Sequence, residues 1–244
     1  MTSSTTKTGT TIRILIHGAS GRMGQALLRL AAERDDAKVV AAVSRAQPAQ
    51  RVVDGVPYFA AKEMHGVPAF DVAIDFSLAG GFDGILGLCA ERDAALVSGT
   101  TGLSDAQRAA LESAATRIPV LSSANFSLGV AVLSELVERA AAALPGWDCD
   151  IVEAHHVHKK DAPSGTALAL GACAEHGGAS PRYASLRAGD IVGEHFVQFT
   201  AAGERIELNH RATNRDIFAR GALHAATRLP ARVPGLYRLR DLLA

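Results

Sequence analysis

A strand, a tight glycine turn and the start of a helix follow one another near the beginning of this chain. Residues 12–16 are strand-like and apolar except for Arg13, and the apolar spacing of residues 21–33 is that of a helix. Between them, Gly18 would permit a sharp turn, Gly21 would let the backbone approach a pyrophosphate, and Gly24 would allow close helix–sheet packing. The spacing GxxGxxG departs from the usual GxGxxG, so a purely structural turn stays open as the alternative.

The first half of the chain continues to alternate strands with helices. Further strands are predicted over residues 39–43, 72–76, 95–98 and 120–123. The capping-box pair Ser104 and Gln107 opens a helix over residues 105–116, and Ser77 is expected to cap the helix that follows the third strand. This alternation predicts an α/β fold with a parallel, doubly wound sheet.

The pattern changes after about Phe126. Helices are predicted over residues 128–143 and 165–175, and strands over 150–156, 194–200 and 204–210. Residues 201–203 would turn the last two strands into a hairpin, which indicates a second, α+β domain with a mixed sheet. A helix over residues 218–228 and a short extended end complete the chain. We therefore predict a disordered leader at 1–11, a dinucleotide-binding domain at 12–126 completed by 217–244, and a substrate-binding and oligomerisation domain at 127–216.

Charge and cysteine content narrow the class of protein. The 25 basic and 25 acidic residues leave no net charge to recruit nucleic acid or an anionic membrane, so neither is expected as a partner. No apolar run is long enough to span a bilayer, and the polar leader lacks the apolar stretch of a secretory signal. Cys89, Cys149 and Cys173 form neither a disulfide framework nor a zinc motif, which favours a reducing, cytoplasmic location.

Two residues after the second strand bear on the choice of cofactor. An acidic residue there commonly binds the ribose hydroxyl of NAD, whereas this chain has Ser44 and Arg45. Arg45 would pair with the 2′-phosphate of NADPH and Ser44 would hydrogen-bond it, so we expect NADPH to be preferred over NADH. The alternative is that Arg45 is an ordinary solvated loop residue.

Small and hydroxylic residues follow the fourth and fifth strands. The two segments are Gly99-Thr100-Thr101 and Ser123-Ala124-Asn125-Phe126. Ligands of open parallel sheets bind beyond the carboxyl ends of the strands, so these segments suit a nicotinamide ribose. Such residues are also common in ordinary turns.

The densest group of chemically capable side chains is EAHHVHKKDAPSGTA, residues 153–167. Two lysines and a helix N-terminus capped by Ser164 would bind a carboxylate, and a histidine beside it is the natural proton donor at neutral pH. A metal site is one alternative, but no further ligands complete a set and the lysines would repel a cation, so no metal is expected. A solvated basic loop without chemistry is the other.

This segment resembles the signature of the dihydrodipicolinate reductase family. GASGRMG, DVAIDFS, VSGTTG, SSANFSLGV, LRAGDIVGEH and IFARGAL occur in the family's order and cover nearly the whole chain apart from the leader. The resemblance implies an N-terminal Rossmann domain with the C-terminal tail folded back onto it, and a substrate domain that assembles a homotetramer. The implied reaction transfers a hydride from NADPH or NADH to a small cyclic dicarboxylate, with loss of water, in diaminopimelate and lysine biosynthesis.

The resemblance also implies roles for individual residues. His155 matches the family's proton donor, and Lys159 matches its second catalytic cation. Substrate contacts are implied for His156, Ser164, Gly165 and Thr166. Cofactor contacts are implied for Gly18, Ala19, Ser20, Gly21, Arg22, Met23, Ser44, Arg45, Gly99, Thr100, Thr101, Ser123, Ala124, Asn125 and Phe126.

Two departures from the family pattern stand out. Several members carry Glu where Ser44 stands, which would serve NADH. Residues 166–187 are also shorter than in many relatives, and we expect a strand and a Gly/Arg-rich loop common there to be missing, which leaves the tetramer geometry open.

Other functions remain as alternatives. An aspartate dehydrogenase-like reductase, a semialdehyde dehydrogenase and a non-catalytic NADPH-sensing protein would share the two-domain plan. A semialdehyde dehydrogenase needs a nucleophilic cysteine at a strand-to-helix turn, and neither Cys89 nor Cys173 is predicted there. A sensor would have no need of His155 and Lys159.

Overall fold

The computed structural model describes residues 11–46 and 49–243, so most of the predicted leader lies outside the described residues. The chain forms two compact units. The first comprises the described residues up to 124 together with 219–242, and the second comprises residues 125–218 and Leu243. In the described part of the chain, no helix is long and apolar enough to cross a membrane.

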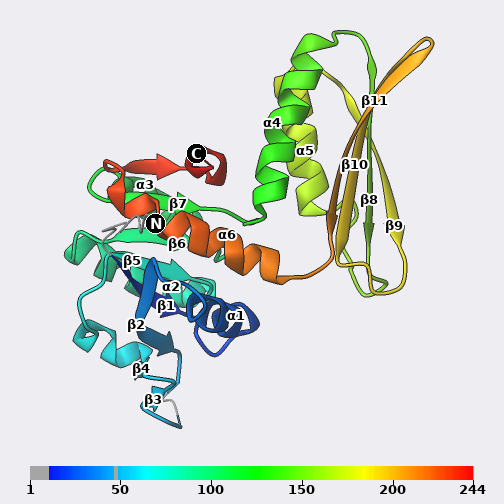
Figure 1. Ribbon diagram of the computed structural model, residues 1–244. Helices are drawn as coiled ribbons and strands as arrows, with labels where there is room; N and C mark the ends of the chain where they lie inside the picture. The colour runs from blue at the N-terminus through cyan, green and yellow to red at the C-terminus, as the bar shows by residue number, and fades with distance from the viewer. Residues whose placement is uncertain (1–10, 47–48, 244) are drawn as a thin grey trace, which may run out of the picture. The chain divides into compact units, whose positions relative to one another are not determined.

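The first unit is built on an eight-stranded sheet with the order β12-β7-β6-β5-β1-β2-β4-β3 (Figure 1). Its strands are β1 (Ile12–His17), β2 (Ala37–Ser44), β3 (Val52–Val53), β4 (Val56–Ala60), β5 (Val72–Asp75), β6 (Ala95–Ser98), β7 (Pro119–Ser122) and β12 (Gly235–Tyr237). Neighbouring strands are parallel except β3, which is antiparallel to β4. The predicted parallel α/β sheet is confirmed, and β3 and β4 add to the strands expected.

Helices complete the first unit. They are α1 (Arg22–Ala31), α2 (Ala79–Glu91), α3 (Asp105–Ala115), most of α6 (Asp216–Ala226), and the 3₁₀ turns η1 (Ala61–Gly66), η2 (Leu229–Ala231) and η3 (Leu239–Leu242). Side chains of α2 and α3 pack with strand residues such as Leu15, Ala73 and Leu96. All four residues of β5 and of β6 are buried, which explains why these strands read as continuous apolar runs rather than as alternating ones.

Helix caps in the first unit agree only in part with the prediction. The capping box of Ser104 and Gln107 is present at α3. Ser77 does not cap α2, because the N-cap residue is Leu78 and the Ser77 hydroxyl donates to the Leu78 carbonyl oxygen over 3.2 Å. The sequence does not distinguish a capping serine from one that bonds its neighbour.

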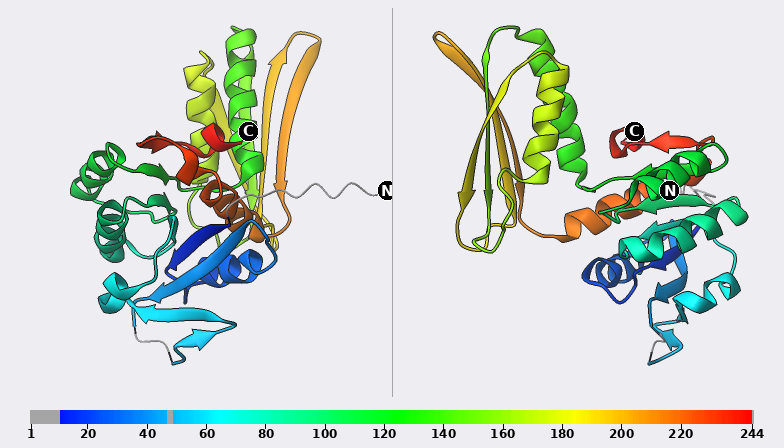
Figure 2. Two further views of the ribbon diagram at one scale, coloured as in Figure 1. Left: turned by 60° about the vertical axis from the view of Figure 1, so that its left-hand side comes forward. Right: turned by 180° about the vertical axis from the view of Figure 1, so that it is seen from behind.

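The second unit is a four-stranded mixed sheet with two helices on one face. Its strands, in the order β11-β10-β8-β9, are β11 (Glu204–Ala212), β10 (Gly193–Ala201), β8 (Asp148–His155) and β9 (Pro181–Arg187). Only β9 is parallel to its neighbour, and β10 and β11 form the predicted hairpin. The helices α4 (Leu128–Ala143) and α5 (Gly165–His176) lie side by side and share a core with β8 and β10 (Figure 2).

The segment between Thr166 and Arg187 corrects the sequence reading. We expected a strand to be missing there, but residues 181–187 form β9, in parallel register with residues 149–155 of β8. Most of its residues are exposed and its pattern is not apolar, so periodicity gave no strand signal. Arg187 at its end, opposite His155 in the ladder, belongs to the site described below.

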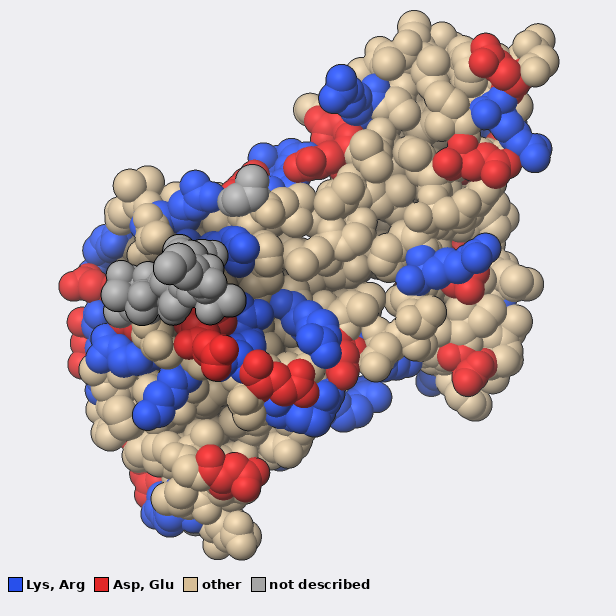
Figure 3. Space-filling model, viewed as in Figure 1, with Lys and Arg blue, Asp and Glu red and all other residues tan. Residues whose placement is uncertain are grey.

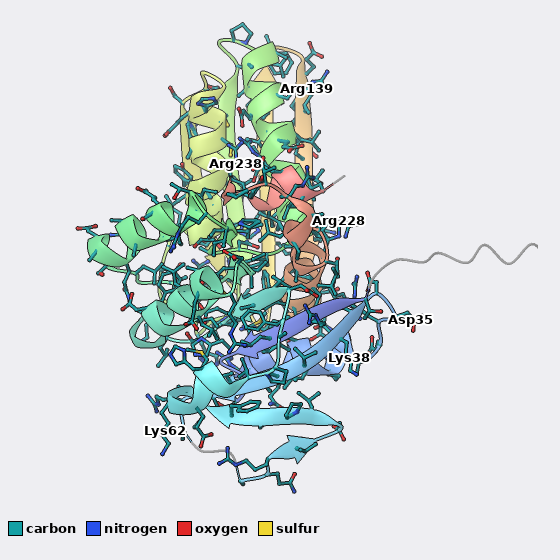
Figure 4. The ribbon with its side chains drawn as sticks, turned by 90° about the vertical axis from the view of Figure 1, so that its left-hand side faces the viewer. Asp35, Lys38, Lys62, Arg139, Arg228 and Arg238 are labelled. Carbon is teal, nitrogen blue, oxygen red and sulfur yellow. The ribbon has the colours of Figure 1, made fainter. Side chains whose placement is uncertain are left out.

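Charged side chains of both signs are interspersed on the face drawn in Figure 3, over both units. This agrees with the zero net charge of the chain. Figure 4 labels Asp35 and Lys38 where the chain enters β2, at the amino ends of the parallel strands. The glycine turn follows β1 at the carboxyl ends, so the candidate cofactor residues of the first unit gather at that edge of its sheet.

Candidate active site

The turn after β1 requires glycine at two positions. Gly18 has a φ of +83°, and a Cβ built on it would lie 2.5 Å from the backbone oxygen of Phe76. A Cβ on Gly24, inside α1, would lie 2.4 Å from the backbone oxygen of Gly18. The turn is held to the sheet because the backbone N–H groups of Gly18 and Ala19 both donate to the Val43 carbonyl oxygen over 3.0 Å. These surroundings support the requirement for glycine at both positions, although the close contact at Gly24 is between α1 and the turn rather than between the helix and the sheet.

The start of α1 has the properties of an anion site. Gly21 is the N-cap residue, no side chain caps the helix, and its first turn has no acidic residue. A cavity of about 250 Å³ adjoins it, lined by Gly21, Arg22, Met23, Phe76, Ser77, Leu78, Ala79, Gly99 and Thr101. Ser20 is exposed in the turn itself. Free N–H groups at a helix N-terminus suit a pyrophosphate, so these residues fit a dinucleotide.

The residues predicted to choose the cofactor stand at the carboxyl end of β2. Ser44 is the last residue of the strand and is buried, whereas Arg45 is exposed directly after it. No carboxylate occupies either position. The loop continues through residues 47–48, which lie outside the described part of the chain.

A buried polar network lies beneath the strand ends, and the sequence reasoning missed it. Asp75, at the end of β5, has no exposed surface. One of its carboxylate oxygens pairs with His17 Nδ1 over 2.9 Å, and the other accepts hydrogen bonds from the hydroxyls of Ser98 (2.9 Å) and Thr100 (2.8 Å). Burial raises the pKa of Asp75, but its hydrogen bonds and the charge of His17 outweigh this and lower it overall. The side chain of Thr100, which is a predicted cofactor residue, is thus engaged within the protein.

The two hydroxylic segments are only partly together. Thr100, Thr101, Ser123 and Ala124 line a cavity of about 450 Å³ in the first unit, along with residues of α3, residues of β12 and Arg238 directly after it. Asn125 and Phe126 belong to the second unit. The Phe126 side chain is buried, and Asn125 Nδ2 donates a hydrogen bond to Thr166 Oγ1 over 3.0 Å.

In the second unit, the histidine-rich segment begins at the end of β8. Ile151, Glu153 and His155 follow one another at every second position of the strand, so their side chains lie on the same face. This is the face on which α4 and α5 pack. The Nδ1 atom of His155 lies 2.5 Å from Glu153 Oε2. Glu153 is fully buried, and the guanidinium of Arg187 donates to both of its oxygens over 2.7 and 2.8 Å. Burial raises the pKa of Glu153, but hydrogen bonds from Arg187, His155 and Ser185 outweigh it and lower the pKa to about 2.

A second histidine joins this group from β10. His195 lies directly opposite Glu153 in the ladder, and its ring meets that of His155 edge-on at 5.3 Å between centroids. Burial, together with the charges of His155 and His210, lowers the pKa of His195 to about 4, so this ring is neutral at neutral pH. His195 belongs to the motif LRAGDIVGEH, but the sequence does not show that it lies beside His155. That proximity follows from the pairing of β10 with β8.

The N-terminus of α5 closes the site. Ser164 is buried and caps the helix by accepting from the Ala167 N–H, while its own N–H donates to Glu153 over 3.2 Å. Gly165 is exposed, and Thr166 is half-buried beside it. Lys159 Nζ pairs with Asp161 over 2.9 Å, and His156 is half-buried next to His155. Three of the predicted substrate residues, Ser164, Gly165 and Thr166, thus form a helix start that has no acidic residue in its first turn.

Among the described residues, no group of three potential ligands could hold a metal ion. The site combines an imidazole, a lysine and a helix N-terminus, a set suited to an anionic substrate that takes up a proton.

Comparison with known families decides the relationship. The family profile described as "Dihydrodipicolinate reductase, N-terminus" matches residues 12–126, and that described as "Dihydrodipicolinate reductase, C-terminus" matches residues 129–243. The chain belongs to the dihydrodipicolinate reductase family. The resemblance seen in the motifs is confirmed.

Similar reductases of this family match almost the whole chain. A 4-hydroxy-tetrahydrodipicolinate reductase of Stenotrophomonas maltophilia (strain R551-3) is 73% identical over 96% of this chain and 98% of the relative. One from Xanthomonas campestris pv. campestris (strain B100) is 71% identical over 95% of this chain and 98% of the relative. The solved dipicolinate-bound dihydrodipicolinate reductase of Paenisporosarcina sp. TG-14 has 22% identity, a TM-score of 0.79, and coverage of 95% of this chain and 99% of its own. That likeness supports the dihydrodipicolinate reductase fold.

Proposed function

We propose that this protein reduces 4-hydroxy-tetrahydrodipicolinate to tetrahydrodipicolinate with NADPH or NADH, as a step of diaminopimelate and lysine biosynthesis. The relatives that match over almost the entire chain carry the name of this activity. The observation that carries the proposal is the position of His155, bonded to buried Glu153 beside the N-terminus of α5. This arrangement combines a proton donor with an anion site.

The dicarboxylate substrate would be held by α5 and by the neighbouring cation. Its carboxylate would accept hydrogen bonds at the helix start from Gly165 and Thr166, with Ser164 fixing the first turn. Lys159 and His156 would supply further donors. We propose that Asp161 holds Lys159 at the site, since its carboxylate is 2.9 Å from Nζ. Orientation of a bound substrate is a large part of catalysis, so these contacts would serve both binding and rate.

The chemistry divides between cofactor and protein. When bound, the nicotinamide supplies a hydride to C4 of the dehydrated, conjugated ring. The ring carbon left enamine-like by that addition then takes a proton, which we assign to His155, with Lys159 as the second catalytic cation. Histidine is the side chain most often used for proton transfer at neutral pH.

The dinucleotide would bind at the glycine turn of the first unit. Residues 18–23 would receive the pyrophosphate, and Ser44 and Arg45 the adenosine ribose, with NADPH preferred because Arg45 can pair with a 2′-phosphate. Residues 99–101 and 123–126 would contact the nicotinamide side. We further propose a cytoplasmic homotetramer assembled by the second unit. In support of this assembly, Val152 and Leu186 are exposed on the sheet of that unit.

Substrate-dependent oxidation of NADPH tests the function. The substrate is generated in place by the synthase that precedes this step, and loss of nicotinamide absorbance is followed with and without the protein. Oxidation should require both the synthase product and the protein. Oxidation with oxaloacetate and ammonia instead would indicate an aspartate dehydrogenase, and NADPH binding without turnover of any of these compounds would indicate a sensor.

A further inference from the structure

Glu153 accepts hydrogen bonds from three separate elements. His155 approaches from β8, Arg187 from the end of β9, and the backbone N–H of Ser164 from the cap of α5. The carboxylate has no exposed surface, and Ser185 of β9 is a further hydrogen-bond partner, so all of its hydrogen bonding is satisfied by protein groups. A single buried carboxylate thus joins the histidine, the arginine and the helix start.

We propose that Glu153 and Arg187 are positioning residues for proton transfer, which hold His155 so that Nε2 is the atom that gives its proton to the substrate. The inference rests on the proposed function. It adds two residues and one specified atom to it.

The charge of Glu153 determines which nitrogen carries the labile proton. An ionised carboxylate only accepts, so Nδ1 must carry a hydrogen whether the imidazole is charged or neutral. Only Nε2 can then change its protonation state. The same holds in other sites where a carboxylate or a carbonyl oxygen accepts from one ring nitrogen and thereby sets the histidine tautomer. The bidentate contact with Arg187 keeps Glu153 ionised despite its burial.

The surroundings of Nε2 agree with this assignment. A Cβ built on Gly193, the first residue of β10, would lie 3.0 Å from His155 Nε2. Glycine there leaves the space next to Nε2 free of a side chain. The titratable and charged groups that face His155 from the packed strands are Glu153, Arg187 and His195, and His195 adds no competing charge because it is neutral.

Arg187 also fixes the loop that carries Lys159. Its guanidinium donates to the carbonyl oxygens of Leu186 over 2.7 Å and of Asp161 over 2.5 Å. Asp161 in turn pairs with Lys159 through its side chain. Arg187 therefore hydrogen-bonds directly to Glu153, the partner of His155, and is linked through Asp161 to Lys159.

The test compares Glu153→Gln with Asp71→Asn, a matched control. Asp71 also accepts an arginine guanidinium and a backbone N–H, both from Arg13, but at the amino end of the sheet of the first unit. Glu153→Gln places an amide donor against donors, so kcat should fall about tenfold to a hundredfold, the usual effect of removing such a partner, with KM and NADPH affinity near those of the parent. Asp71→Asn should leave kcat unchanged.

A second pair of variants tests access to Nε2. Gly193→Ala should lower kcat because the new methyl group crowds Nε2, whereas Gly87→Ala, in open space on α2, should not. Arg187→Lys keeps the positive charge but loses the bidentate guanidinium contact, so it should lower kcat. This variant provides the test if Glu153→Gln fails to fold.

Nitrogen NMR of the His155 ring reads the tautomer without turnover. The neutral ring of the free protein should carry its proton on Nδ1. The proposal would be overturned by a neutral ring with its proton on Nε2, or by a folded Glu153→Gln protein whose kcat equals that of the parent. It would also be overturned if Arg187→Lys and Gly193→Ala both had the kcat of the parent. Loss of activity in the parent itself would reject the proposed function while the NMR result still decides the tautomer.

Discussion

The side-chain amide of Asn125 donates a hydrogen bond to the hydroxyl of Thr166 over 3.0 Å. The amide oxygen of Asn125 accepts from the Ser127 N–H over 2.8 Å, so the orientation of the amide is determined at both ends. Thr166 therefore accepts from Asn125 and has its own hydrogen free to donate. The sequence predicts a cofactor contact for Asn125 and a substrate contact for Thr166, yet the two side chains bond to each other.

This orientation makes a prediction for substrate affinity. Thr166→Val removes the free donor and should mainly raise the KM for the dicarboxylate. Asn125→Asp should raise KM about tenfold or more, because the Thr166 hydroxyl would then donate to the introduced carboxylate and a negative charge would face the substrate. Steady-state kinetics with measured NADPH affinity distinguish the two ligands. If both variants bind substrate as the parent does, the carboxylate site lies elsewhere.

Lys159 should affect both binding and rate. We expect Lys159→Ala to lower kcat and raise KM together, because the same cation would hold the dicarboxylate and serve as the second catalytic cation. Lys160→Ala is the control, since Lys160 is the exposed next residue. Equal effects of the two substitutions would show that only the charge of the loop matters and would contradict the role given to Lys159.

Cofactor choice should depend on Arg45. A charge-assisted hydrogen bond contributes about 1.5–3 kcal/mol, so Arg45→Ala should weaken NADPH about tenfold to a hundredfold at low salt and leave NADH unchanged. The loss should shrink as salt rises, because Arg45 is exposed.

Ser44→Glu should weaken NADPH and improve NADH, and its thermal unfolding must be checked because Ser44 is buried. Equal affinity of the parent for both cofactors, with no effect of either substitution, would show that the adenosine ribose binds elsewhere.

The buried network at Asp75 should contribute to stability in a pH-dependent way. The folded pKa of Asp75 is lower than its unfolded value, so its ionised form stabilises the fold above about pH 4, and this contribution is lost as pH falls through the folded value. Asp75→Asn should lower the free energy of unfolding by about 1–3 kcal/mol at neutral pH. The difference in free energy of unfolding between parent and variant should become smaller as the pH is lowered. A difference that stays constant with pH in denaturant titrations would contradict this account.

The sequence predicts the first unit well because its signals are local. Apolar runs buried on both faces give β5 and β6, the φ of +83° at Gly18 is a local requirement of the turn, and Gly24 is required by its close contact with Gly18 in the same strand–turn–helix. The sequence does not predict β9, because most residues of that strand are exposed and give no apolar pattern. It wrongly predicts a helix cap at Ser77, because the hydroxyl of Ser77 donates to the carbonyl oxygen of Leu78.

The candidate site shows the same division. His155, Lys159 and Ser164 stand in one segment, so residue types and spacing identify them. Glu153 stands in that segment too, but its role depends on Arg187 and His195, which are 34 and 42 positions away and arrive by strand pairing. Asp75 and His17 are likewise 58 positions apart. A single sequence gives no measure of such pairings.

The most direct measurement follows the hydride by its isotope label and tests the proton donor by substitution. The parent and His155→Gln are given NADPH deuterated at the transferring position of C4, with substrate made in place by the synthase, and tetrahydrodipicolinate is analysed by mass spectrometry. The account predicts one deuterium in the product of the parent, and product formation about a hundredfold slower in His155→Gln with NADPH affinity unchanged. Product without deuterium, or a His155→Gln protein as fast as the parent, would contradict it.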